Sequence, residues 1–248
     1  MDNPLHPFEL HPIGQLSLFG LDISLNQAVI MMWVVMALVA GLLIAAGTSN
    51  RLVPTKLQSL AELLVDFIRG MILETMGKDG MRFFPFLATL FLFILFCNLL
   101  GLIPGLYTVT SQIVVTAAFA LFVYGMSVVV GVARHGIKFL GILIPPGTPL
   151  WLLPLMMPIE LISQLARPLS LAVRLFANMT AGHTVLAVLF GMALSLPLLI
   201  AWLPFAFTVA INGLEVIIAF IQAYIFTILT CVYLGDAMHL HGHGEHAH

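Results

Sequence analysis

Charged side chains are scarce in this 248-residue chain, and that scarcity excludes several classes of protein. Asp, Glu, Lys and Arg make up 8% of the residues, where a soluble domain carries about 25%. The formal net charge of −2 argues against a nucleic-acid partner, which would need a basic surface. Hydrophobic residues reach 61% and the mean hydropathy is +1.10. At about 20 apolar residues per membrane crossing, the length leaves no room for a separate soluble catalytic domain.

Other absences narrow the chemistry further. The 2 cysteines, Cys97 and Cys231, each lie inside an apolar run, so a disulfide framework is not expected. No Gly-x-Ser-x-Gly sequence occurs, which leaves a serine hydrolase without its nucleophile motif. No long internal repeat is visible, and this argues against a transporter built from two inverted halves. No cofactor is expected from the sequence.

Long apolar runs define five expected membrane crossings. They cover residues of about 26–47, 83–103, 111–133, 150–195 and 200–235. Residues 54–77 differ, because apolar side chains recur there every three or four positions while Glu62, Asp66 and Arg69 share another face. That window carries five charges, so we expect it to lie on the membrane surface. The chain is thus expected to be an all-α polytopic membrane protein with five crossing helices and one surface amphipathic helix.

The final two expected helices are too long to cross the membrane upright. At about 1.5 Å per residue, a helix over 150–195 would approach about 70 Å, against a hydrocarbon core of about 30 Å. It must therefore tilt strongly, bend, or break at Pro154, Pro158 or Pro168. Pro197 places a turn between the two helices, which predicts an antiparallel hairpin.

Lys and Arg residues fall in loops on one side of the expected membrane. None precedes Arg51, five lie within 48–82 and two lie within 134–149. By the positive-inside rule, the N-terminal segment 1–25 is external and the His-rich tail 237–248 is cytoplasmic. Residues 26–236 are expected to form a single membrane domain between them.

Four charged residues interrupt the last two apolar runs: Glu160, Arg167, Arg174 and Glu215. An Arg at the centre of a membrane helix costs about 2.5–3.5 kcal/mol on insertion scales, so Arg174 needs compensation. A structural ion pair with Glu215 and a snorkelling side chain are the alternatives to a functional charge. On a helical wheel that starts at Glu160, polar residues form one stripe that must face protein or water: Ser163, Gln164, Arg167, Ser170, Arg174 and Asn178.

Two polar pairs are expected at equal depths in the hairpin. Counting outward from a turn near Pro197 sets Arg174 level with Gln222, and His183 level with Glu215. His183 lies opposite Arg174 on the wheel, so we expect it to face a different cavity. A His and a carboxylate at one depth have the composition of a proton path, with a satisfied buried hydrogen-bond pair as the alternative. Metal binding would need a third ligand, which the sequence does not offer.

The segment 167–183, RPLSLAVRLFANMTAGH, is followed by Leu214-Glu215 and by FIQAYIF at 220–226. This pattern closely resembles the a subunit of the rotary F-type ATP synthase, and the resemblance extends over nearly the whole chain. It implies that Arg174 faces the ring of c subunits. It also implies roles along two proton half-channels for Asn178, His183, Glu215 and Gln222, with Glu160 near the cytoplasmic exit. The pairing of His183 with Glu215 is similar to alphaproteobacterial and mitochondrial members.

The resemblance implies a non-catalytic stator subunit that conducts protons to and from the c-ring carboxylates. The implied partners are the c-subunit ring, the peripheral-stalk b subunits, the other ATP synthase subunits and the lipid bilayer. The implied location is a bacterial inner membrane, with the mitochondrial inner membrane as the alternative. Two rival functions stay open, namely a self-contained proton-coupled secondary transporter and a structural membrane scaffold.

Overall fold

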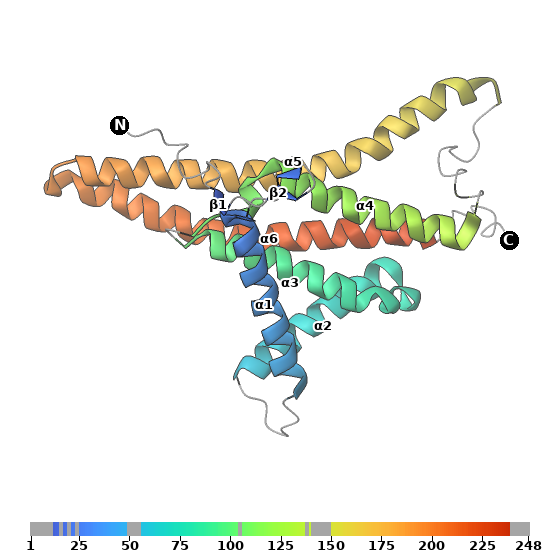
Figure 1. Ribbon diagram of the computed structural model, residues 1–248, viewed down its shortest axis with the longest axis horizontal. Helices are drawn as coiled ribbons and strands as arrows, with labels where there is room; N and C mark the ends of the chain where they lie inside the picture. Colours follow the sequence, from blue (N-terminus) through green and yellow to red (C-terminus); the bar gives the residue numbers. More distant parts are fainter. Residues whose placement is uncertain are drawn as a thin grey trace.

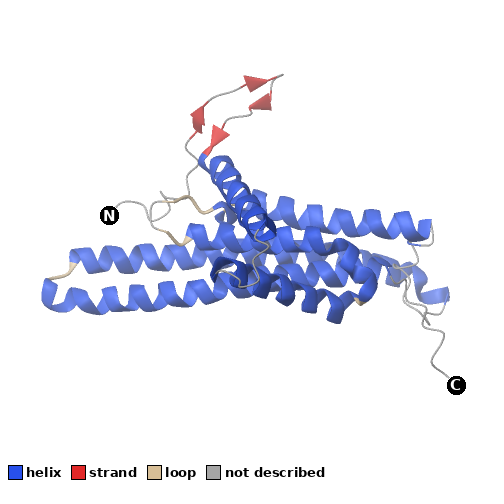
Figure 2. Cartoon of the chain, turned by 90° about the horizontal axis from the view of Figure 1, so that it is seen from below, coloured by secondary structure: helices blue, strands red, loops and turns tan. Residues whose placement is uncertain are grey.

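The computed structural model describes residues 12–14, 17–18, 21–22, 25–48, 56–103, 106–136, 139 and 150–238. Two short antiparallel strand pairs precede the helices: β1 (Pro12–Gly14) with β4 (Leu25–Asn26), and β2 (Ser17–Leu18) with β3 (Leu21–Asp22). The sequence did not predict these strands, which project beyond the first helix (Figure 2). Most of the expected external segment 1–25, and the expected tail from residue 239 onward, lie outside the described residues.

The membrane region is helical, as expected, and five described helices are long and apolar enough to cross a membrane. They are α1 (Gln27–Thr48), α3 (Phe84–Gly101), α4 (Ile113–His135), α5 (Leu153–Ser195) and α6 (Leu198–Met238). The remaining long helix, α2 (Lys56–Met76), is not among them. Three short 3-10 helices complete the described elements: η2 (Lys78–Phe83), η3 (Val109–Ser111) and η5 (Leu150–Leu152).

Helices α5 and α6 form the antiparallel hairpin that the prolines predicted, with Leu196 and Pro197 at the turn. Helix α5 is continuous through Pro158 and Pro168, and it bends instead of breaking, so that its N-terminal part swings away from the bundle (Figure 1). Its 43 residues extend over about 65 Å at 1.5 Å per residue. Helix α1 runs steeply across the hairpin in Figure 1. A membrane that α1 crosses upright is therefore crossed obliquely by the hairpin.

The core lies where α3 packs against α6. Leu87, Phe91 and Ile94 of α3 are almost fully buried, and they belong to the same buried cluster as the small side chain of Ala223 on α6. Small residues at a helix interface let the two backbones approach closely, which is the usual packing of helices in a membrane. This central contact holds α6 in place while the tip of the hairpin extends beyond the other helices (Figures 1 and 2).

Helix α2 docks on the outside of this core through an aromatic contact. The ring centroid of Phe67 lies 5.9 Å from that of Phe91 and 5.8 Å from that of Phe220. The buried face of α2 comprises Ala61, Ile68, Met71, Ile72 and Met76. Leu60 and Leu63 stay 54% and 71% exposed on another side, which differs from the single apolar face that the sequence predicted. A helix with both packed and exposed apolar sides is suited to lie between protein and lipid.

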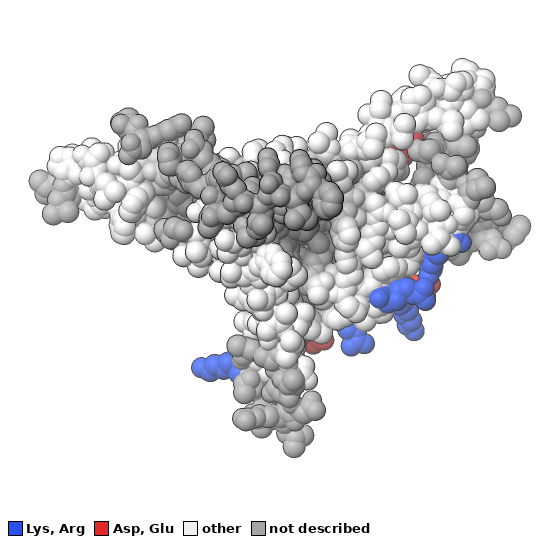
Figure 3. All heavy atoms as spheres, viewed as in Figure 1, with Lys and Arg blue, Asp and Glu red and all other residues white. Residues whose placement is uncertain are grey.

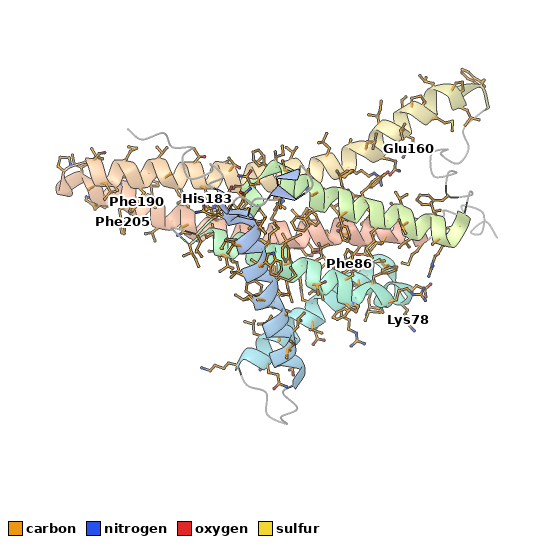
Figure 4. The ribbon with its side chains drawn as sticks, in the orientation of Figure 1. Lys78, Phe86, Glu160, His183, Phe190 and Phe205 are labelled. Carbon is orange, nitrogen blue, oxygen red and sulfur yellow. The ribbon has the colours of Figure 1, made fainter. Side chains whose placement is uncertain are left out.

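Most of the basic side chains visible in Figure 3 lie toward the lower right of the molecule, although blue also appears at the lower left, and most of this face carries no charge. Lys78, in η2, marks that end in Figure 4. Arg134 and His135 close the last turn of α4. An uncharged middle with basic residues near one end is the distribution that a membrane-embedded surface requires.

Candidate functional site

Arg174 lies on an exposed face of α5. Small residues flank it on this face, since Ser170 and Ala177 are also exposed, while Leu171 and Leu175 are buried in the bundle. Within the described part of the chain, no ion pair reaches the guanidinium of Arg174. A cation inside a membrane helix needs stabilisation by protein or water, because lipid cannot provide it.

The polar stripe expected along α5 is divided between two directions. Gln164 is 8% exposed and turns inward, where its amide nitrogen donates to Oε1 of Glu160 at 3.0 Å. Arg167 lies 3.6 Å from the carboxylate of Asp236 on α6, and its guanidinium stands 5.9 Å from the ring centroid of Tyr233. Arg167 therefore has a partner in this chain. Its neighbour on the stripe, Arg174, makes no ion pair among the described residues.

His183 faces the bundle and meets the segment that leads into α4 (Figure 4). Its Nε2 lies 2.9 Å from Oγ1 of Thr108, which comes just before η3. The same hydroxyl lies 3.3 Å from the carbonyl oxygen of Gly101, at the end of α3. The exposed Arg174 and the inward His183 thus face different sides of α5, in agreement with the helical wheel.

Glu215 packs directly over the backbone of Gly182, the residue before His183. A Cβ atom built on Gly182 would lie 1.8 Å from Oε1 of Glu215, so a side chain there would displace the carboxylate. Glu215 is 8% exposed, and its Oε2 has no hydrogen-bond partner in the described structure. This contact agrees with the equal depth expected for His183 and Glu215. The alternative ion pair between Arg174 and Glu215 is absent from the described residues.

Asn178 lies between Arg174 and His183 along α5, where it is half-buried. Gln222 of α6 is 4% exposed, and its Nε2 has no hydrogen-bond partner among the described residues. Arg174 points outward and Gln222 inward, and no hydrogen bond joins them in the described structure. Arg174 and Gln222 are therefore paired only by their expected equal depth in the hairpin, and they do not bond to each other directly.

A buried polar segment between α3 and α4 contributes groups that were not among the expected site residues. Oγ1 of Thr110 donates to Oδ1 of Asn98 at 3.0 Å, and both residues are fully enclosed. Nδ2 of Asn98 has no hydrogen-bond partner in the part of the chain that the structure describes. The hydroxyl of Ser111 donates to the carbonyl of Thr108 at 2.7 Å. The signal in the sequence was a short polar run after Pro104 in an otherwise apolar chain, which is typical of an ordinary loop.

Tyr107 and Gln112 close the two ends of this segment. The amide nitrogen of Gln112 donates to the phenol oxygen of Tyr107. Burial raises the pKa of Tyr107 above its usual range, against the opposing effect of that hydrogen bond, so the phenol stays protonated at neutral pH. Among the residues that the structure describes, no group of three or more His, Cys, Asp or Glu side chains could hold a metal ion.

Residues 29–235 match the ATP synthase A chain family. The chain belongs to that family. ATP synthase subunit a of Magnetococcus marinus is 49% identical over 244 residues, which cover 96% of this chain and 94% of that protein. Subunit a of Rhizobium johnstonii is 48% identical over 247 residues, or 97% of this chain and 99% of that protein. Subunit a of Pelagibacter ubique is 45% identical over 241 residues, which cover 96% of this chain and 98% of that protein.

Membership of the ATP synthase A chain family, together with the five long apolar helices, makes this chain a multi-pass membrane protein. The range that matches the family contains α3 to α5 entirely and almost all of α1 and α6. It also contains every residue expected from the sequence to handle protons: Glu160, Arg174, Asn178, His183, Glu215 and Gln222.

Proposed function

We propose that this chain is the proton-translocating stator subunit of an ATP synthase and serves the c-subunit ring through two offset half-channels. The observation that carries the proposal is the position of Arg174, a permanent cation that faces outward between two polar sites of α5. The chain makes no bond of ATP itself. Its contribution is to couple proton flow to rotation of the ring, from which the catalytic subunits obtain their energy.

A self-contained proton-coupled transporter is the second candidate. Such a protein would enclose its central charge, because an intramembrane ion needs protein or water around it. Arg174 is exposed instead, beside the small residues Ser170 and Ala177. Small residues allow another helix to approach closely. These features favour a site that a second protein completes, and the c-subunit ring is the partner that fits.

The uptake half-channel is proposed to end at the seam between α5 and α6. Glu215 is buried there, one of its carboxylate oxygens has no hydrogen-bond partner among the described residues, and His183 lies at the same level. A carboxylate and an imidazole are the side chains best able to exchange protons near neutral pH. Gln222 and Asn178 continue the polar surface from this seam toward the level of Arg174. A proton from the external side then reaches a carboxylate of the ring.

The release half-channel is proposed to pass Glu160 at the opposite end of α5, where Gln164 holds its carboxylate. Along the helix, Arg174 lies about 21 Å from Glu160 and about 14 Å from His183, at 1.5 Å per residue. Arg174 favours the ionised form of any ring carboxylate that faces it, and so promotes release and blocks a direct leak. Each proton then delivers about 2.3 kcal/mol per 100 mV of membrane potential.

We infer the remaining features from the sequence. The N-terminal segment 1–25 lies outside, residues 26–236 form one membrane domain, and the tail 237–248 is cytoplasmic. The membrane is a bacterial inner membrane, or a mitochondrial one in the alternative, and the peripheral-stalk b subunits are further partners. Labelling of single cysteines at Asn3 and Gly244, in a cysteine-free background, tests the orientation. Reaction of both positions from the same side of the membrane would contradict it.

Substitution of Arg174 in the assembled complex tests the function. Arg174→Ala should abolish proton-driven ATP synthesis in vesicles, because no other cation faces outward at that level among the described residues. The released catalytic head should still hydrolyse ATP. Arg167→Ala is the matched control, since Arg167 is an arginine of the same helix with its own partner, Asp236. Substantial synthesis by Arg174→Ala, or equal losses in the two variants, would refute the proposal.

A further inference from the structure

Thr108 makes contacts unlike those of most other threonines in the described structure. The hydroxyls of Thr75, Thr89, Thr184, Thr208, Thr227 and Thr230 bond to carbonyl groups of their own helix. Thr108 instead reaches two distant elements, with Oγ1 2.9 Å from Nε2 of His183 on α5 and 3.3 Å from the carbonyl oxygen of Gly101 on α3. It therefore connects the end of α3 to the imidazole of the uptake site.

We propose that Thr108 is a positioning residue that holds the imidazole of His183 in one orientation through both of its protonation states. The inference rests on the proposed function, because it assigns Thr108 to the uptake half-channel of that function. The contact joins residues 75 positions apart, so it depends on the folded structure and not on local sequence.

The hydroxyl of Thr108 is suited to this role because it can both donate and accept a hydrogen bond. When Nε2 carries a proton, that N–H donates to Oγ1, and the hydroxyl proton turns to the Gly101 carbonyl. When Nε2 is bare, the hydroxyl donates to Nε2 instead. One rotation of the O–H bond therefore serves both states of His183 without movement of the ring. A carbonyl could only accept, and an ammonium could only donate.

The surroundings of Thr108 keep its hydroxyl in place. Thr108 is 6% exposed, and the next residues, Val109 and Thr110, are each 1% exposed. The hydroxyl of Ser111 donates to the Thr108 carbonyl, which fixes the backbone from the other side. The side chain fits against the α-carbon of Gly101, where an added Cβ would lie 2.8 Å from Cγ2 and 3.0 Å from Oγ1 of Thr108. Glycine at 101 is thus what leaves room for the threonine.

The first test removes the hydroxyl with little change of shape. In the assembled complex, Thr108→Val should lower proton uptake into vesicles about three- to tenfold, the effect of losing one hydrogen bond. Thr108→Ser keeps the hydroxyl and should restore uptake to within about twofold of the wild type. Thr227→Val is the matched control, because Thr227 is fully buried and its hydroxyl donates to the carbonyl of Ala223 in its own helix. Equal uptake in Thr108→Val and the wild type would overturn the inference.

The second test asks whether Thr108 acts through His183. Against a His183→Ala background, Thr108→Val should change the residual proton uptake by less than about twofold, because the bond it removes is already lost. If Thr108 only stabilised the loop, Thr108→Val would lower proton uptake by the same factor in both backgrounds. Additive losses would therefore overturn the inference, and they would do so even if Thr108→Val lowers the amount of assembled complex.

The third test displaces the hydroxyl from the α3 side. Gly101→Ala should lower uptake as Thr108→Val does, because the new Cβ pushes against Cγ2 of Thr108. Adding Thr108→Ser removes that methyl group and should recover part of the activity, whereas no recovery would count against the inference. Failure of the proposed function is distinguishable, since it would show as proton-driven ATP synthesis that survives Arg174→Ala. Loss of ATP synthesis in Arg174→Ala with no effect of Thr108→Val on proton uptake would overturn the inference alone.

Discussion

The middle of α5 and its half near the hairpin turn hold their polar residues in different ways. Toward the hairpin turn, His183 bonds to Thr108 and Glu215 packs over Gly182, so the described residues of this chain enclose the site. At the middle of the helix Arg174 faces outward. The difference indicates that the enclosed site is complete in the isolated chain, whereas the outward face is completed only by a partner.

Within the enclosed site, the largest effect is expected from its two titratable side chains. Glu215→Ala and His183→Ala should each remove most of the proton uptake, because each deletes a titratable group of the same seam. In the double variant the cost in free energy should be less than the sum of the two single costs, since both belong to one unit. Uptake rates in vesicles for the two single variants and the double variant measure this coupling.

Exchange of the two residues gives a control for that coupling. The variant with both His183→Glu and Glu215→His should recover part of the activity that either change alone removes, because the seam again holds one acid and one base. The competing hypothesis is that Glu215 alone carries protons and His183 only packs against the helices. Strictly additive losses of free energy, together with no recovery in the exchange variant, would support this competing hypothesis. His183 and Glu215 would then act independently and not as one unit.

A second prediction uses the two glycines of α5 that differ in their surroundings. A Cβ on Gly182 would collide with the Glu215 carboxylate, whereas a Cβ on Gly191 would meet nothing within 4 Å. Both changes to Ala raise helix propensity by about 1 kcal/mol, so their difference isolates the collision. We expect Gly182→Ala to lower proton uptake about tenfold, because Glu215 must leave the seam, and Gly191→Ala to leave it unchanged. Similar uptake in the two variants would mean that the carboxylate works equally well elsewhere.

Much of the fold followed from the order of apolar and polar residues. Apolar runs of membrane length predicted the five long helices, and Pro197 predicted the hairpin turn between α5 and α6. The helical wheel predicted that His183 and Arg174 face different sides, because the geometry of a helix is local. The strands β1 to β4 were not predicted, since pairs of two or three residues leave no periodic pattern.

The partners of the site residues were harder to predict. Thr108 reaches His183 across 75 residues, and no local pattern encodes a contact between a loop and a helix so far along the chain. Gln164 was assigned to the same polar stripe as Arg174, but in the structure it is 8% exposed and turned inward. An ideal wheel assumes a straight helix, whereas α5 carries Pro158 and Pro168 and bends.

A smaller effect is expected at the back of the enclosed site. Asn98 is fully buried, and its Nδ2 has no hydrogen-bond partner among the residues that the structure describes. An unpaired buried amide is costly unless a water molecule bonds to it. Asn98→Leu should lower proton uptake about threefold without reducing the amount of assembled complex, because leucine packs well but offers no polar group. Thr110→Val, which removes the other member of the hydrogen bond, is the matched comparison. Unchanged uptake with increased thermal stability would mean that Asn98 is only a structural burden.

The smallest effect is expected on the outward side, at the ion pair between Arg167 and Asp236. The two charged groups lie 3.6 Å apart and their side chains are 37% and 35% exposed, so the pair contributes at most about 1 kcal/mol. Asp236→Asn should therefore change proton-driven ATP synthesis by less than about twofold and lower the thermal stability of the assembled complex only slightly. A loss of synthesis as complete as that expected for Arg174→Ala would contradict this estimate. Such a loss would show that Asp236 keeps Arg167 from competing with Arg174 for the carboxylates of the ring. The function of the outward face would then require an ion pair within this chain as well as the partner.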